Sequence, residues 1–460
     1  MFMSNNYCSP LDITQIEQNF AEINPALTAA EAMHEANRCL YCYDAPCIHA
    51  CPTHIDVPSF IKKIATGNLQ GSARVIFDAN PIGATCARVC PVDVLCEGAC
   101  VEKTLLKKPI EIGRLQQFAT DYALEKGTPV FEKGEPNGKS VGIVGSGPAG
   151  LSCAAYLARL GYDVTVYERR PLAGGLNTYG MAEYKMPQSV SVAEAEHIAK
   201  LGVKFLLNTA IIKGGDDELD IGEEISKVSF DLLNEWHDAI FLGIGLGATN
   251  KLNIPGEKLG GVYDALDFIE QIKTRDWKSV PLGKTVAVIG AGNTAIDAVT
   301  QAKRLGAEKV IMVYRRTEKD ISAYDYEYEL AKKDGVEFVW QAAPIGILSD
   351  TDYTCVTGLQ CEKTDGSLML FDIPCDMVIK AVGQTKMRSF FETVAGVAVD
   401  DKGRVTVNEL MQTSNPKIFA GGDCANGGAE AVDAAQMGKL AAQGIHKSLT
   451  GESVKFAGAV

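Results

Sequence analysis

Residues 139–170, "KSVGIVGSGPAGLSCAAYLARLGYDVTVYERR", restrict the fold more than any other stretch of the chain. They read as a strand, a glycine-rich turn, a helix and a second strand. Gly145, Gly147 and Gly150 form the pattern G-x-G-x-x-G, which gives a tight turn, a close main-chain approach to a pyrophosphate and close helix–strand packing. Glu168 ends the second strand, where an acid accepts hydrogen bonds from an adenosine ribose. The segment therefore predicts a Rossmann-like unit within an α/β domain.

The chain repeats this unit at residues 284–316, "KTVAVIGAGNTAIDAVTQAKRLGAEKVIMVYRR". The first two glycines of the pattern recur, and Ala295, which is also small, takes the third place. Arg315 and Arg316 stand where the first unit has its acid, and arginine accommodates a 2′-phosphate because its planar fork matches phosphate oxygens. The first unit thus fits FAD or NAD, and the second fits NADP(H). A solvated basic pair at the end of a strand is the alternative interpretation of the two arginines.

A third nucleotide element is expected at residues 417–449, "KIFAGGDCANGGAEAVDAAQMGKLAAQGIHKSL". A short apolar strand leads to Gly422 and Asp423, and an aspartate there can bind a flavin ribityl or phosphate group. A small-residue helix starts near Glu430, and its N-terminus can face the electron-rich carbonyl edge of a flavin. The motif resembles the closing motif of flavoproteins with two dinucleotide-binding domains, such as the thioredoxin reductase and glutathione reductase group. That resemblance implies an FAD domain interrupted by an inserted nicotinamide domain.

Two further apolar strands, within 239–249 and 377–385, end in glycine-rich turns and look like the crossovers between these domains. No C-x2-C motif follows either Rossmann-like unit. A thioredoxin reductase dithiol is therefore absent, and electrons must leave the flavin by another route.

Eight of the fourteen cysteines lie between residues 39 and 100. The first four, with the following proline, read C-x2-C-x4-C-x3-C-P, close to the ferredoxin run C-x2-C-x2-C-x3-C-P, whose last cysteine serves the other of two iron–sulfur clusters. A second group, "CARVCPVDVLCEGAC", adds four more thiols, so the eight could hold two four-ligand clusters. Zinc is the alternative, because it also takes four thiolates at short spacings. Zinc cannot carry electrons, however. The nucleotide-binding units indicate a redox protein, so they favour iron–sulfur clusters over zinc.

Composition and charge exclude several classes of protein. A formal net charge of −14 gives no basic face for nucleic acid. The first twenty residues show neither a basic n-region nor an apolar h-region, so we expect no secretory leader, and no apolar run approaches the roughly 18 residues of a membrane span. We therefore expect a cytoplasmic protein that acts on small molecules or a protein partner. Residues 125–140, rich in Gly, Pro and charge, read as a linker.

The cysteine-rich part, from "EANRCLYCYDAPCIHACPTHIDV" to "CARVCPVDVLCEGACV" and "PIEIGRLQQFATDY", resembles the N-terminal part of dihydropyrimidine dehydrogenase. The separate flavin subunit of the bacterial two-subunit enzyme is the nearest match. The likeness continues through "GGLNTYGMAEYKMPQSV" and covers essentially the whole chain. The same module occurs as the small subunit of glutamate synthase.

This resemblance implies a subunit that takes hydride from NAD(P)H onto FAD and passes single electrons through two [4Fe–4S] clusters. The electrons go to an FMN- and iron–sulfur-containing catalytic subunit that reduces uracil or thymine to 5,6-dihydropyrimidines. A hetero-oligomer such as a heterotetramer is implied, and no catalytic acid or base is expected in this chain. The alternatives are the small subunit of glutamate synthase or another NAD(P)H-dependent electron donor, and a zinc-stabilised interaction protein.

The resemblance also implies the ligands of both clusters, one held by Cys39, Cys42, Cys47 and Cys100 and the other by Cys51, Cys90, Cys96 and Gln116. Cys86 is then left without a cluster, and it is the alternative eighth ligand. The residues expected to contact the dinucleotides are Gly145, Gly147, Pro148, Ala149, Gly150, Glu168, Gly175, Leu176, Gly290, Gly292, Asn293, Thr294, Arg315, Arg316, Ala381, Gly383, Gly422, Asp423, Glu430 and Val432.

The expected fold is α/β with an α-helical iron–sulfur head and two Rossmann-like domains, the NAD(P) domain being inserted in the FAD domain. The expected domains are the head at 1–135, the two parts of the FAD domain at 136–249 and 384–460, and the NAD(P) domain at 250–383. The chain departs from its relatives at Met181 and Ala182, where an Ile-Pro step is common, and at Ser322, where the mammalian enzyme has a further arginine. The mammalian enzyme uses NADPH and the bacterial two-subunit form NADH, so both coenzymes remain open.

Overall fold

The computed structural model describes residues 7–127, 130–212, 225–394 and 396–458. Within these residues the chain forms two compact units. The chain leaves the larger unit after residue 247 and returns to it at residue 386, so the main part of the smaller unit, residues 248–385, is an insertion in the sequence of the larger one. The smaller unit comprises residues 7–23, 179–187 and 248–385, and the larger unit comprises residues 24–178, 188–247 and 386–458.

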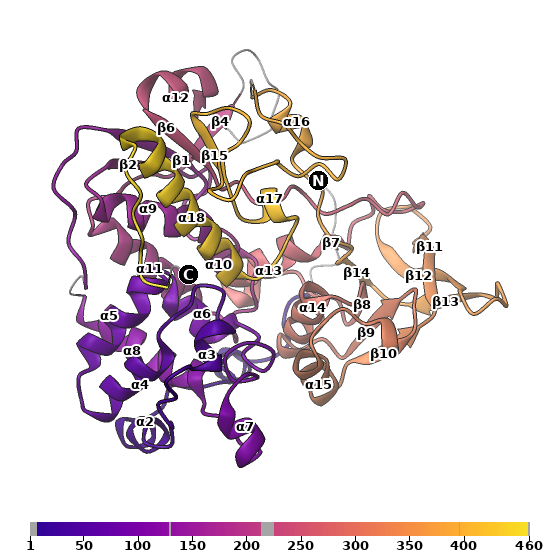
Figure 1. The fold of residues 1–460 in the computed structure, drawn as a ribbon. Coiled ribbons are helices and arrows are strands. Elements are labelled where there is room, and N and C mark those ends of the chain that lie inside the picture. Colours follow the sequence, from indigo (N-terminus) through magenta and orange to yellow (C-terminus); the bar gives the residue numbers. More distant parts are fainter. Residues whose placement is uncertain (1–6, 128–129, 213–224, 395, 459–460) are drawn as a thin grey trace. The chain divides into compact units, whose positions relative to one another are not determined.

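Helices fill the N-terminal part of the larger unit, drawn from indigo to purple in Figure 1. Thr28 and Glu31 form a capping box at the first of them, and Asp56 and Asn68 accept hydrogen bonds from main-chain N–H groups at the start of two others. These caps satisfy donors that a helix N-terminus otherwise leaves unpaired. The predicted helical head is thereby confirmed. Its helices are α2 (Ala29–Ala36), α3 (Pro46–His49), α4 (Val57–Ala65), α5 (Leu69–Ala79), α6 (Gly83–Val89), α7 (Val101–Leu105) and α8 (Ile112–Lys126).

A five-stranded parallel sheet follows the head in the larger unit, with strand order β15-β6-β1-β2-β3. The central strands are buried along almost their whole length, as expected for a parallel sheet covered by helices on both faces. Strand β15, from the C-terminal part of the chain, pairs with β6 and completes this sheet after the insertion. The strands are β1 (Ser140–Val144), β2 (Asp163–Tyr167), β3 (Lys204–Leu206), β6 (Ala239–Leu242) and β15 (Ile418–Ala420).

Helices α9 and α18 pack against each other beside this sheet (Figure 1). The other elements that accompany the sheet are short, and β4 and β5 form a separate parallel pair. The elements are α9 (Pro148–Arg159), α10 (Leu176–Tyr179), α11 (Gln188–Ala199), β4 (Thr209–Ile212), β5 (Ser226–Ser229), α12 (Phe230–Trp236), α16 (Arg388–Phe391), α17 (Asp423–Asn426) and α18 (Ala431–Thr450).

The smaller unit has its own five-stranded parallel sheet, with order β10-β9-β8-β14-β7, and an antiparallel sheet with order β11-β12-β13. The strands are β7 (Val262–Asp264), β8 (Thr285–Ile289), β9 (Lys309–Tyr314), β10 (Glu337–Trp340), β11 (Ala342–Ser349), β12 (Val356–Lys363), β13 (Leu370–Pro374) and β14 (Met377–Lys380). The helices are α1 (Ile13–Asn19), α13 (Ala265–Thr274), α14 (Asn293–Arg304) and α15 (Asp325–Lys333), with 3-10 turns η1 (Trp277–Ser279) and η2 (Glu318–Asp320).

Helix α1 packs in the smaller unit rather than in the helical head that follows it in sequence. Ile16 is fully buried there, and the ring of Phe20 stacks on Trp277 with 5.1 Å between the ring centroids. The Oγ of Ser9 donates a hydrogen bond of 2.5 Å to the carbonyl of Leu305. These apolar contacts draw residues 7–23 onto the inserted sheet, because their burial there removes large apolar side chains from water.

The structure confirms a helical N-terminal region followed by an α/β region with parallel sheets. Among the residues that the structure describes, no helix combines the length and the apolar composition that crossing a membrane requires.

Candidate functional site

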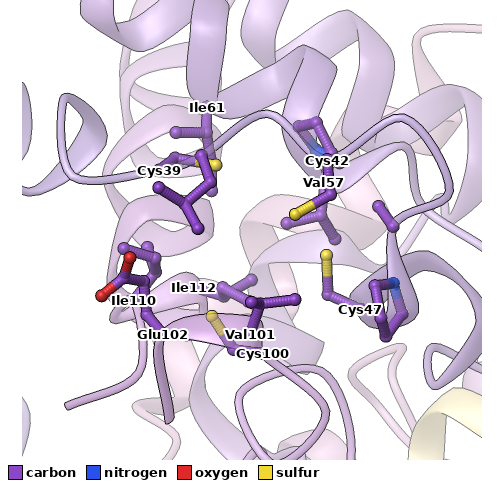
Figure 2. A pocket seen from close by; sticks show the side chains of 14 residues that line it. Cys39, Cys42, Cys47, Val57, Ile61, Cys100, Val101, Glu102, Ile110 and Ile112 are labelled. Atoms are coloured by element: carbon purple, nitrogen blue, oxygen red, sulfur yellow. The ribbon is translucent and has the colours of Figure 1, made fainter. Parts of the chain in front are cut away.

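Four cysteines line one hollow in the helical head (Figure 2). Cys39 and Cys42 lie in the chain between α2 and α3, Cys47 lies in α3, and Cys100 is the N-cap residue of α7. These are the four residues assigned to one cluster from the sequence. The labelled apolar side chains of the lining are Val57, Ile61, Val101, Ile110 and Ile112.

The four thiols line a hollow that opens to solvent at its mouth. In a [4Fe–4S] cluster held by four cysteines the thiolates surround a polynuclear group. Among the described residues, no three His, Cys, Asp or Glu side chains are grouped as they would be around one metal ion. Four thiols around one hollow are the donor set that a [4Fe–4S] cluster takes.

Two thiols of this hollow, those of Cys39 and Cys47, have a pKa above the ordinary value for a thiol. Burial, together with the neighbouring Cys100 and Cys39, raises the pKa of the Cys47 thiol to about 12. Burial also raises the pKa of Cys39. Low polarity and like charges both oppose ionisation here, whereas a bound metal deprotonates a coordinating thiol outright. The chemistry of the donor set therefore suits a bound metal ion or cluster, which would supply the positive charge.

Cys51, Cys90 and Cys96 form a second group in the head. Cys51 is buried, Cys90 is the C-cap residue of α6, and Cys96 lies in the turns between α6 and α7. A hydrogen bond with Cys86 raises the pKa of the Cys90 thiol, and burial and the nearby thiols of Cys86, Cys96 and Cys51 raise it further. The structure thus brings together the three cysteines assigned to the other cluster, with Cys86 beside them.

Gln116 lies on α8, which packs against α6, and its side chain is buried. Its Nε2 donates a hydrogen bond of 2.7 Å to the main-chain carbonyl of Gly83 at the start of α6. This bond fixes the orientation of the amide and uses its nitrogen, so that the oxygen, which has the free lone pairs, is the atom available to a metal. The role of Gln116 as a ligand stays a prediction.

The turn between β1 and α9 has the shape of a pyrophosphate cradle. A Cβ atom at Gly150 would lie 2.0 Å from the carbonyl oxygen of Gly145, so the helix and the strand can approach only with glycine there. A Cβ at Gly147 would meet no protein atom within 4 Å, which leaves open space beside the main chain. Glu168 is buried, and its carboxylate accepts hydrogen bonds from the main-chain N and the Oγ of Ser146, at 3.0 and 2.6 Å.

The second side of this cradle is formed by the starts of α17 and α18. Asp423 begins α17, and burial raises the pKa of its carboxyl. Glu430 is the N-cap residue of α18. A Cβ at Gly438 would lie 2.2 Å from the carbonyl oxygen of Ala149, so α18 can pack this closely on α9 only without a side chain there. Because β1 and β15 are parallel, the N-termini of the two helices that follow them lie at the same edge of the sheet.

A loop after β2 closes over the glycine turn. A Cβ at Gly175 would lie 2.7 Å from the Cα of Gly147. Leu176 follows it and is exposed, whereas Asn177 is fully buried. The Oδ1 of Asn177 has no hydrogen-bond partner in the described part of the chain. A buried amide oxygen in that state is expected to meet a polar group of a bound molecule.

The smaller unit carries the second cradle, between β8 and α14. A Cβ at Gly290 would lie 2.2 Å from the carbonyl oxygen of Ala381, just after β14. A Cβ at Gly292 would meet only the Oγ of Ser322, at 3.5 Å, which is ordinary contact. The main chain at Gly292 is therefore open, as at the equivalent glycine of the first unit.

Arg315 and Arg316 follow β9 with exposed side chains. Their main-chain carbonyls accept hydrogen bonds from the Oγ1 of Thr364, at 2.6 Å, and the main-chain N of Gln341, at 3.0 Å. The end of the strand is thus fixed while the guanidinium groups remain in solvent. This arrangement suits a phosphate-binding pair and also suits a solvated basic pair.

Glu194 is a buried acid that the sequence analysis did not single out. It lies on α11, and its carboxylate accepts hydrogen bonds from the main-chain N atoms of Ala84, at 2.6 Å, and Thr85, at 3.1 Å, and from the Thr85 hydroxyl. Burial raises the pKa of Glu194 to about 7. The α/β half of the larger unit therefore holds the N-terminus of α6, the helix that ends at Cys90. An acid within a helix reads as a solvated residue in sequence, so no local signal identifies it.

Comparison with known proteins gives matches over both parts of the chain. Residues 139–438 match the family model described as pyridine nucleotide-disulphide oxidoreductase. Residues 16–128 match the model described as dihydropyrimidine dehydrogenase domain II, 4Fe-4S cluster.

Curated relatives of two kinds are similar over nearly the whole chain. The glutamate synthase [NADPH] small chain of Escherichia coli K12 is 34% identical, covering 95% of this chain and 95% of the relative. The NAD-dependent dihydropyrimidine dehydrogenase subunit PreT of the same organism is 32% identical, covering 95% of this chain and 98% of the relative. PreT of Salmonella typhimurium is 33% identical over 94% of this chain and 98% of its own length.

Among solved structures, thioredoxin reductase of Lactococcus lactis matches with a TM-score of 0.53 and 24% identity, covering 68% of this chain and all of that one. FprA of Mycobacterium tuberculosis in complex with NADPH matches with a TM-score of 0.53 and 19% identity, covering 69% and 85%. At these identities the likeness concerns the fold alone.

Proposed function

Because the chain belongs to the pyridine nucleotide-disulphide oxidoreductase family and carries a 4Fe-4S cluster domain, we propose that it is the electron-input subunit of a dihydropyrimidine dehydrogenase. It is an NAD(P)H-dependent flavoprotein electron donor of the type shared by PreT and the glutamate synthase small chain. The finer proposal is that its electrons pass through two [4Fe–4S] clusters to an FMN-containing partner that reduces uracil or thymine.

The observation that carries this proposal is the position of the four-cysteine hollow. It lies in the same compact unit as the cradle of β1 and α9, which is proposed to bind FAD. Within that unit, Glu194 ties the α/β half to α6, and α6 ends at Cys90. The residues proposed to hold the flavin and those proposed to hold the clusters thus belong to one hydrogen-bonded framework.

Each residue of this framework has a physical role in the proposal. The open main chain at Gly147 admits the FAD pyrophosphate, and Glu168 accepts hydrogen bonds from its ribose. The N-terminus of α18 favours negative charge at the flavin carbonyl edge. Bound FAD would accept hydride from NAD(P)H and release electrons singly, which iron–sulfur clusters accept singly. The protein mainly binds, orients and excludes water, so it needs no catalytic acid or base of its own.

The cluster ligands are proposed as two sets. Cys39, Cys42, Cys47 and Cys100 form the set around the hollow of Figure 2. Cys51, Cys90, Cys96 and Gln116 form the other set. Arg315 and Arg316 are proposed to bind the 2′-phosphate of NADPH, which their exposure permits.

A protein partner is supported by apolar side chains that remain exposed in the head. They stand beside the cluster cysteines in sequence, and a docked partner would cover them. They are Leu40, Tyr43, Val94, Leu105 and Leu106.

The small subunit of a glutamate synthase is the second candidate, because the relative with that name is 34% identical over 95% of this chain. The two candidates differ in their partner. The purified chain would be mixed in turn with an FMN-containing dihydropyrimidine dehydrogenase subunit and with a glutamate synthase large subunit from the same organism. The first proposal expects uracil-dependent NAD(P)H oxidation with the former only, and activity with the latter alone would overturn it.

A further inference from the structure

Lys439 is a fully buried lysine near the middle of α18. Its Nζ donates hydrogen bonds of 3.0 Å to the main-chain carbonyl of Thr53 and 3.0 Å to that of Ala457. The ring of Tyr156 lies beside the ammonium group, with 5.8 Å between Nζ and the ring centroid. Lysine is almost never fully buried without a paired charge. Its surroundings therefore call for an explanation.

No carboxylate in the described residues forms an ion pair with this ammonium group. Asp78 influences it electrostatically, but the carboxylate of Asp78 is paired with Arg159 at 2.5 Å. Burial lowers the pKa of Lys439 to about 8, against the opposing effects of Cys51 and Asp78. An ammonium ion taken out of water is unfavourable without a counter-charge, so a nearby anion would stabilise the charged form of Lys439.

Cys51 lies on the other side of Thr53 from Lys439. The carbonyl that binds Lys439 belongs to Thr53, and the Oγ1 of Thr53 lies 3.4 Å from the Sγ of Cys51. Thr53 therefore connects the ammonium group of Lys439 to Cys51, so a negatively charged group held by Cys51 would supply the missing counter-charge.

We propose that Lys439 is the fixed counter-charge of the cluster held by Cys51, Cys90, Cys96 and Gln116, and that it raises the reduction potential of that cluster. The inference rests on the proposed function, which assigns those ligands. On reduction the cluster gains one electron and no bond forms or breaks. The added negative charge is stabilised by a nearby cation, and the effect is strong because a buried pair is poorly screened. Lys439 thereby favours electron transfer onto this cluster.

Two substitutions separate the charge of Lys439 from its hydrogen bonds. Lys439→Met removes both, whereas Lys439→Gln removes the charge and keeps a donor. Lys447→Met, an exposed lysine on the same helix, is the control. The holoprotein with FAD would be titrated anaerobically and followed by electron paramagnetic resonance, and a Cys90→Ser variant would identify the signal of the Cys51 cluster.

We expect both Lys439 variants to lower the equilibrium constant for reduction of the Cys51 cluster at least tenfold, which is ~59 mV for one electron. The other cluster and the Lys447→Met control should keep their potentials. Loss of the Cys51 cluster alone in both variants would equally support a required counter-charge.

Three results would overturn the inference. The first is an unchanged reduction potential in both variants, and the second is an equal shift in the potentials of both clusters. The third is a shift in the potential of the Cys51 cluster in Lys439→Met but not in Lys439→Gln, which would assign the effect to hydrogen bonding. If the unsubstituted protein contains neither iron nor acid-labile sulfide, the proposed function fails with it. If both clusters are present and only the potential is unmoved, this inference alone fails.

Discussion

Glu194 and Thr85 join the two halves of the larger unit. The main-chain N of Thr85 lies 3.1 Å from one carboxylate oxygen of Glu194, and the Thr85 hydroxyl donates to the other. Glu194 belongs to α11 and Thr85 to α6, so an acid from the α/β half satisfies donors at the start of a helix from the head. Cys90 is the C-cap residue at the other end of α6.

The first prediction concerns the pH dependence of this contact. Burial raises the pKa of Glu194 from 4.5 to about 7, so between these pH values the folded chain binds a proton that the unfolded chain has released. The contribution of Glu194 to the free energy of unfolding therefore falls as pH rises through that range, by at most ~3 kcal/mol. Glu194→Gln resembles the protonated acid at every pH, so this contribution to stability should not fall in the variant as pH rises.

The measurement is the thermal unfolding midpoint of the loaded protein at pH 5 and pH 8. The midpoint should fall less with pH in Glu194→Gln than in the unsubstituted protein, while the exposed Glu196→Gln on the same helix should behave like the latter. Parallel pH profiles for the unsubstituted protein and Glu194→Gln would refute the role of this acid.

The second prediction compares two glycines of one turn. Gly147 has φ −67°, which alanine adopts readily, and its Cβ would meet no protein atom within 4 Å. Gly147→Ala should therefore leave the thermal midpoint of the FAD-free protein unchanged and weaken FAD binding at least tenfold. Gly150→Ala should lower the thermal midpoint and also weaken FAD binding, because its Cβ would lie 2.0 Å from a carbonyl oxygen. FAD binding that survives Gly147→Ala would show that no pyrophosphate lies there.

The third prediction tests the ligands of the second cluster. Cys90→Ser and Gln116→Ala should each reduce the chain from two clusters to one, because a ligand is lost. Cys86→Ala should keep both clusters, since Cys86 is assigned only a hydrogen bond to Cys90. Iron and acid-labile sulfide per chain measure the outcome. A cluster lost in Cys86→Ala and retained in Gln116→Ala would make Cys86 the eighth ligand.

The nucleotide cradles could be predicted from the sequence because their geometry is local. The spacing of Gly145, Gly147 and Gly150 alone predicts the role of each position. Gly150 lets the helix pack closely on the turn, and Gly147 leaves the main chain open to a ligand. The four cysteines of the hollow in Figure 2 are those that the resemblance to dihydropyrimidine dehydrogenase implies for one cluster, whereas their spacing alone predicts only that eight thiols could hold two clusters.

Glu194 and Lys439 could not be predicted in this way. Their partners, Thr85 and Thr53, stand 109 and 386 positions away in the chain, and only the packed fold brings them together. For the same reason no local pattern predicts that residues 7–23 pack on the inserted sheet.

The fourth prediction concerns the choice of coenzyme. Replacing Arg315 and Arg316 together by alanine should raise the KM for NADPH at least tenfold and leave the KM for NADH nearly unchanged, because only NADPH carries the 2′-phosphate. Lys319→Ala, which removes another exposed cation after β9, is the control. An equal loss with both coenzymes would indicate that the arginines are a solvated pair without a phosphate.

The central claim is that the cysteine-rich head accepts electrons from the flavin. Its most direct test is an analysis of metal and acid-labile sulfide combined with an anaerobic titration with NAD(P)H. The account predicts iron and acid-labile sulfide in equal amounts, FAD, and cluster signals that appear as the flavin absorbance bleaches. Stoichiometric zinc without acid-labile sulfide, or clusters that stay oxidised beside a fully reduced flavin, would contradict it.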